Sequence, residues 1–369
     1  MSDSIFDRLF ELFQTPGPVN WKLAAEVRKS LAGTSMPVEP ALAEEYRELT
    51  LAAQLRMASA THLDLTAPRD LQPVDAATWA EENEQSFRFA LEPLADKLSV
   101  QPEMPEQMAG NPLAAMMASL GPAVLGMQAG TMVGLLSHRV LGQFDAGLPT
   151  LDHNDLYLVV PNVESFATEH GLDARQVRMW AAAHEVVHHA ILNLPWVRGR
   201  VVDAMDHYYA GVEFDPSRLT DALGAMDQPD QIEDMLGGAN SLGALLGAET
   251  DPGRLAPLQA LVAAIDGYGD YVVRRSLDGV VPDLTRIEEA IARRRIEPTP
   301  GEDFLGQLAG IELNRRHGRD AAALFTEIER RWGDEAVETA WAEPDHLPTL
   351  EELTDPVGWA ARILLDDPI

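Results

Sequence analysis

Cysteine is absent from the 369 residues of this chain. Disulfide bonds, thiolate catalysis and cysteine-ligated metals are therefore excluded, and any metal site must be built from His, Asp and Glu. Basic charge is scarce as well, since 59 acidic side chains face 28 basic ones and the formal net charge is −31. That charge repels nucleic-acid phosphates and anionic membrane surfaces, so we expect neither as a partner.

A basic, apolar leader is also missing from the first residues, where Asp3 and Asp7 stand. A secretory signal would begin with positive charge and continue with an apolar run, so the sequence predicts a cytoplasmic protein. Hydrophobic residues make up 46% of the chain, which is enough for a substantial core at this length. Oligomeric state does not follow from these features.

One long uncharged run, Met108 to His138, has the length of a membrane span. Pro112 and Pro122 interrupt it, and it has few large aliphatic side chains in succession. We predict a buried helical hairpin here, with membrane contact as the alternative. Three glycines four residues apart would let a second helix approach one face closely: Gly126, Gly130 and Gly134.

Most of the remaining pattern is helical, so we expect a mainly α protein with a small β element (α+β). The segment Leu156 to Val160, closed by Pro161, predicts a strand because it is short, β-branched and aromatic. Pro-containing breaks occur at TPGPVN, DLQPVD and IEPTPGEDF. They suggest an N-terminal helical scaffold (1–104), a metal-binding core (105–296) and a C-terminal helical region packed on it (297–369).

The most informative stretch is AAAHEVVHHAIL, residues 181–192. Asp173 and Gln176 form a capping-box pattern, and Asn193 to Pro195 end the periodic run, so we predict a helix over residues 174–192. His184 and His188 lie one turn apart on its apolar face and could bind one zinc ion.

Glu185, between the two histidines, stands where the general base of H-E-x-x-H enzymes stands. Zinc acidifies a bound water, and such a carboxylate accepts the water's proton during attack on a carbonyl. A metal site without turnover and a histidine pair that only packs in the core are the alternatives. His189 is rotated by about 100° from His188, so we expect a surface or supporting role for it.

A third ligand is expected in the segment 257–279, which reads as a helix. Asp266 and Asp270 interrupt its apolar face four residues apart, and buried carboxylates need a cation or hydrogen-bond donors. Asp266 is the preferred ligand and Asp270 the supporting carboxylate or alternative ligand. The competing interpretation pairs both with Arg274 and Arg275 as ordinary ion pairs.

These motifs, with IDGYGDYVVRR, IARRRIEP and LPTLEELTDPVGWAARI, resemble the zincin-like metallopeptidases of actinobacteria over residues 105–365. This family was long of unknown function, and some members are labelled as associated with biosynthesis of a deazaflavin coenzyme. By analogy with zincins whose third ligand opens E-G-x-A-x-Y, DGYGDY aligns Asp266 with the ligand. The chain departs from that pattern by having the shorter Asp where Glu is usual.

The resemblance and the residues together predict a zinc-dependent metallohydrolase, most simply a metallopeptidase acting on a peptide or small amide. Leu156 to Val160 would be the edge strand that holds an extended substrate. The alternatives are a non-catalytic, zinc-stabilised binding or accessory protein and a membrane-associated factor. The glycine-rich segment 234–254 is expected to be a connector, and Glu233 and Glu249 are the next candidate ligands.

Overall fold

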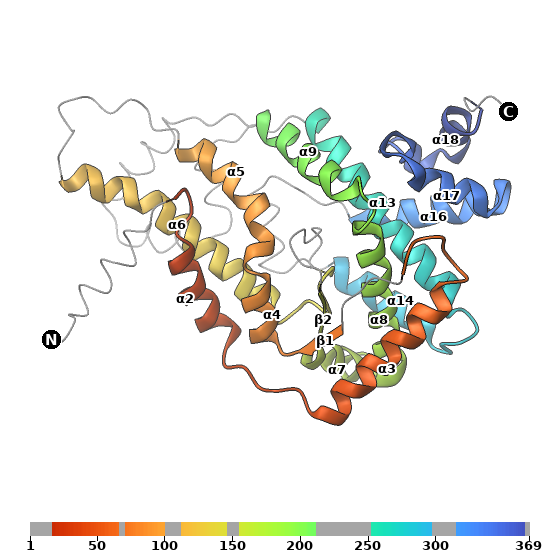
Figure 1. The fold of residues 1–369 in the computed structure, drawn as a ribbon, viewed down its shortest axis with the longest axis horizontal. Coiled ribbons are helices and arrows are strands. Elements are labelled where there is room, and N and C mark those ends of the chain that lie inside the picture. Colours follow the sequence, from red (N-terminus) through yellow and green to blue (C-terminus); the bar gives the residue numbers. More distant parts are fainter. Residues whose placement is uncertain are drawn as a thin grey trace.

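The computed structural model describes residues 17–65, 71–99, 112–145, 155–211, 252–296 and 315–365. Helices dominate these ranges and surround one short sheet, which confirms the mainly α prediction with a small β element (Figure 1). The principal helices are α2 (Trp21–Ala32), α3 (Pro40–Met57), α4 (Ala76–Asn83), α5 (Arg88–Ser99), α6 (Pro112–Leu136), α7 (Val160–Glu169), α8 (Ala174–Leu192), α9 (Val197–Ala210), α13 (Pro252–Leu277), α14 (Leu284–Ile296), α16 (Arg315–Trp332), α17 (Asp334–Ala342) and α18 (Pro356–Ile363). The strands are β1 (Leu71–Val74) and β2 (Leu156–Val159).

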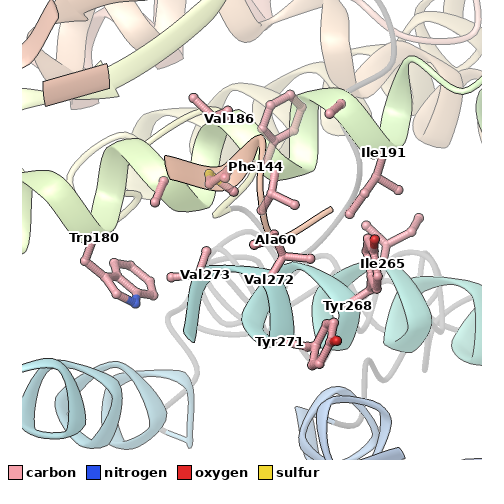
Figure 2. Close-up of a cluster of buried hydrophobic side chains, with 14 of the residues drawn as sticks. Ala60, Phe144, Trp180, Val186, Ile191, Ile265, Tyr268, Tyr271, Val272 and Val273 are labelled. Carbon is pink, nitrogen blue, oxygen red and sulfur yellow. The ribbon is translucent and has the colours of Figure 1, made fainter. Parts of the chain in front are cut away.

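The core is centred on α8, whose residues are buried almost continuously from Val177 to Leu192. Helix α13 runs beside it, and Figure 2 shows side chains of both helices meeting, among them Trp180, Val272 and Ile265. Helices α3 and α16 to α18 belong to the same cluster of buried apolar side chains. Because α8 is enclosed on all sides, its polar residues must find partners inside the protein.

The sheet differs from the sequence prediction in two ways. Strand β2 ends at Val159, and Val160 already begins α7 with Pro161 in its first turn. It pairs in parallel with β1, which falls in DLQPVD, a segment the sequence marked only as a break. A Pro at the third strand position hid it, although an edge strand tolerates Pro.

Strand β2 is also not an edge strand. On the side away from β1, Gln143 N donates to Tyr157 O (3.0 Å) and Val159 N donates to Leu141 O (2.9 Å). All four β2 residues are buried. Its backbone groups are therefore paired on both sides, and the prediction that it holds an extended substrate is wrong.

The described part of the uncharged run forms one continuous helix, α6, from Pro112 to Leu136, and not the predicted hairpin. Its glycines do allow a close helix contact, as expected, and the partner is α2 (Figure 1). A Cβ on Gly126 or Gly130 would lie 2.3 Å from the carbonyl oxygen of Asn20 or Ala24, so only Gly fits there. Among the described helices, none has the length and apolar character needed to cross a bilayer.

Candidate metal centre

Helix α8 has the predicted bounds, Ala174–Leu192. Asp173 caps its start by accepting from Gln176 N (3.0 Å), as the capping-box pattern indicated. The helix carries His184, Glu185 and His188 into the core, where each is at most 2% exposed. The local sequence thus determines where these groups lie, and burial determines what they can bond.

The two imidazoles lie together, with ring centroids 4.0 Å apart. His188 Nδ1 is 2.8 Å from the carbonyl oxygen of His184, which can only accept, so this nitrogen carries the proton. With the proton on Nδ1, the other ring nitrogen, Nε2, is the acceptor. This atom is buried without a hydrogen-bond partner and lies 3.7 Å from Asp266 Oδ1.

Helix α13 reaches His188 closely because of Gly269. A Cβ at this position would lie 2.4 Å from His188 Cε1 and 2.9 Å from Nε2. Gly267 faces α16, since its Cβ would lie 2.4 Å from the Ala321 side chain. One glycine therefore brings Asp266 and His188 together, and the other seats α13 on α16.

His184 also carries its ring proton on Nδ1, but its partners differ from those of His188. Its Nε2 lies 3.1 Å from Nη2 of Arg295, and a guanidinium can only donate. Nδ1 therefore carries the proton and donates to Glu185 Oε1 (3.2 Å). Burial first, and then the charges of His188, Arg295 and Arg294, hold the pKa of His184 well below its ordinary value, so the ring is neutral.

Arg295, in the IARRRIEP segment, also reaches this site, and its contact with His184 is one that the sequence did not predict. Besides His184 it binds Asp270, through Nη1 to Oδ2 (3.0 Å). The interpretation in which Arg274 and Arg275 pair with Asp266 and Asp270 is wrong, because Arg274 binds Glu288 and Arg275 binds Asp334. Arg295 lies on α14, far from both motifs in sequence, so no local spacing could reveal it.

Glu185 is enclosed by the segment that follows α6. Its Oε2 accepts from Phe144 N (3.0 Å), and a Cβ on Gly142 would lie 2.3 Å from its carboxyl carbon. Burial raises the pKa of Glu185 well above its ordinary value, opposed by the Phe144 N–H and reinforced by Asp145. The carboxylate is thus suited to holding a proton, but it faces the protein interior.

The sequence predicted either a surface or a supporting role for His189, and the structure excludes the surface position. It is 3% exposed, and Asn193 Nδ2 lies 3.0 Å from its Nδ1. The predicted connector 234–254, up to the start of α13, and the fallback ligands Glu233 and Glu249 lie outside the described residues.

The donor atoms of this site fit a zinc ion in part. Two imidazoles present Nε2, and a carboxylate oxygen lies 3.7 Å from one of them. Ligands at about 2.0–2.1 Å from a tetrahedral zinc stand roughly 3.3 Å apart, so His188 and Asp266 fit with a small adjustment. As the side chains stand, no three His, Asp or Glu groups within the described ranges form a metal site. His184 joins the other two only if Arg295 moves away from its Nε2.

A helix carrying H-E-x-x-H beside a carboxylate helix is the arrangement of a zincin. The chain belongs to the zincin-like metallopeptidase family, whose model matches residues 19–360. A solved structure from Chloroflexus aurantiacus, described as a candidate hydrolase with a novel fold, shares the fold with 22% identity and a TM-score of 0.68. The similarity covers 95% of this chain and 100% of that one. No curated protein matches.

Proposed function

We propose that this protein is a zinc-dependent hydrolase that cleaves an amide bond in a peptide or small amide. The observation that carries the proposal is the His188 Nε2 atom, buried without a partner and facing Asp266 Oδ1 across 3.7 Å. A buried acceptor of this kind is costly unless something binds it. Membership of the zincin-like metallopeptidase family supports the same chemistry.

His184, His188 and Asp266 would hold the zinc, which supplies an acidified water and polarises the substrate carbonyl. Glu185 would accept the proton at Oε1, which then gives up its contact with His184 Nδ1. Phe144 N–H would keep the second carboxyl oxygen in place during this change. We also propose that the protein acts in the cytoplasm.

Asp270 would act on Arg295 and not on the metal. Its Oδ2 holds Nη1 of the guanidinium, so it determines where Arg295 lies relative to His184. The Asp270 carboxylate orients the planar guanidinium of Arg295. That guanidinium could also bind the carboxylate or carbonyl oxygen of a substrate.

A second candidate is a non-catalytic protein in which zinc only clamps α8 to α13. The complete enclosure of Glu185 and the position of Arg295 favour it, because both restrict access to the site. Glu185→Gln separates the two candidates. A hydrolase should keep zinc stoichiometry and lose amide cleavage, whereas a clamp has no cleavage to lose; unchanged cleavage in the variant would assign the base elsewhere.

A further inference from the structure

A separate cavity of about 680 Å³ lies between the end of α6, α7 and α14. Its lining is rich in cationic and polar side chains: His138, Arg139, Leu141, Asn162, Ser165, Phe166, Glu169, His170, Arg293 and Arg294. We propose that this cavity, the α7–α14 pocket, binds a small organic anion through its carboxylate or phosphate group. This inference does not depend on zinc or on hydrolysis.

The charge of the pocket contrasts with that of the whole chain. Three arginines line it, against one carboxylate, Glu169, in a protein of net charge −31. Asp145, which is 8% exposed and does not line the pocket, pairs with Arg294 (2.7 Å). The pocket is therefore locally positive, although the protein as a whole is strongly acidic. Cationic clefts of this kind raise the local concentration of anions.

Two of the arginines are fixed in position before any ligand arrives. Arg139 Nη2 donates to the carbonyl oxygen of Arg294 (3.1 Å), and Arg294 donates in return to the carbonyl oxygen of Arg139. Asn162 Nδ2 donates to Ser137 O and Val140 O, both at 2.8 Å, and so holds the segment that carries Arg139. A pocket held in this way loses little conformational entropy on binding.

Phe166 forms an aromatic floor between two cationic or ionisable groups. The His170 ring centroid lies 4.5 Å from it, and the Arg294 guanidinium carbon lies 6.0 Å from it. An organic ligand can therefore place its carbon skeleton on Phe166 and its charged group among the arginines. The volume suits such a molecule, since ligand sites commonly measure about 300–1,000 Å³.

Arg293 provides the group that remains available. Its side chain is exposed, and its recorded contact is from Nε to the backbone oxygen of Glu289 (3.3 Å). Within the described part of the chain it has no carboxylate partner, so both terminal nitrogens can donate in parallel to one oxyanion. The net charge of −31 opposes extended polyanions, which favours a compact ligand over nucleic acid.

The test is calorimetric titration of the whole protein with inorganic phosphate and, separately, succinate at constant ionic strength. Arg293→Gln is the test variant. Arg286→Gln is the matched control, because Arg286 is an exposed arginine on the same helix that binds Asp283 and the Gly171 carbonyl oxygen and does not line the pocket. Thermal unfolding of both variants establishes that they fold.

We expect saturable binding of at least one anion, about tenfold weaker in Arg293→Gln and unchanged in Arg286→Gln, as loss of a charge-assisted contact predicts. Preference for phosphate or for succinate identifies the ligand's charged group. Absence of saturable binding of both anions, or equal affinity in the two variants, would overturn the proposal. Zinc content and hydrolysis play no part in this readout, so its failure leaves the proposed function untouched.

Discussion

Arg295 Nη2 lies 3.1 Å from His184 Nε2, so a guanidinium takes the lone pair that a zinc ion would need. Asp270 holds the same guanidinium from its other side. Arginine is permanently charged and cannot yield this position by losing a proton. Zinc binding must therefore displace it, at the cost of a partly buried charge-assisted hydrogen bond.

Arg295→Gln should consequently raise the zinc affinity, by about tenfold if the lost contact is worth about 1.4 kcal/mol. Competition against a chromophoric chelator measures this. Arg293→Gln is the control, because Arg293 is a neighbouring arginine that contacts neither histidine. This variant should bind zinc as the wild type does. Equal or weaker binding by Arg295→Gln would show that the guanidinium does not compete with the metal.

Asp266 and Asp270 should separate in the same assay. Asp266→Ala removes the carboxylate that faces His188 Nε2 and should weaken zinc binding by more than about 100-fold, as expected for loss of one of three ligands. Asp270→Ala removes the partner of Arg295 and no expected ligand, so it should change affinity less, by about 10–100-fold at most. The reverse order would assign the ligand to Asp270.

Two further variants test what Asp266 contributes. Asp266→Asn keeps the size of the side chain but loses its charge, and we expect it to bind zinc nearly as poorly as the Ala variant. Asp266→Glu keeps the charge and adds one methylene, and it should retain substantial affinity. If Asp266→Asn binds zinc as tightly as the wild type, the negative charge of Asp266 does not contribute to zinc binding.

Gly269→Ala tests the close approach of α13 to His188. The added Cβ would lie 2.4 Å from His188 Cε1, so the ring or the helix must shift. We expect a loss of about 1–3 kcal/mol in the free energy of unfolding, and weaker zinc binding. Gly199→Ala is the control, because no atom lies within 4 Å of its added Cβ; it should stabilise α9 by about 0.5–1 kcal/mol. Urea unfolding distinguishes them, and equal effects of the two substitutions would contradict the packing argument.

The parts of this structure that local pattern controls were predictable from the sequence. The bounds of α8 follow from Asp173 and Asn193, and the close helix contact at Gly126 follows from the absence of side chains. What failed depends on tertiary context. A four-residue strand containing Pro73 has no local signature, and one continuous helix through Pro122 is stable only because neighbours pack against it. The contact of Arg295 with His184 was missed for the same reason, since it joins α14 to α8.

The last prediction concerns acid stability and the partly buried pair of Asp145 and Arg294. Burial alone would raise the pKa of Asp145, but the Arg294 charge and hydrogen bond outweigh it, with further help from Arg295 and Leu141 N, and the pKa is lowered. A carboxyl whose pKa is lower in the folded state stabilises the protein above its unfolded pKa of about 3.9, and the contribution is lost as pH falls through the folded value. Asp145→Asn should therefore lose about 1–3 kcal/mol at pH 7, because the partly buried Arg294 is left without its counterion. The difference from wild type should shrink progressively below about pH 4, as the wild-type carboxyl takes up its proton. Urea unfolding at a series of pH values measures both effects, with the exposed Asp278→Asn as the control that should be near neutral throughout. A deficit in Asp145→Asn that stays constant down to pH 2 would mean that its loss reflects packing and not charge.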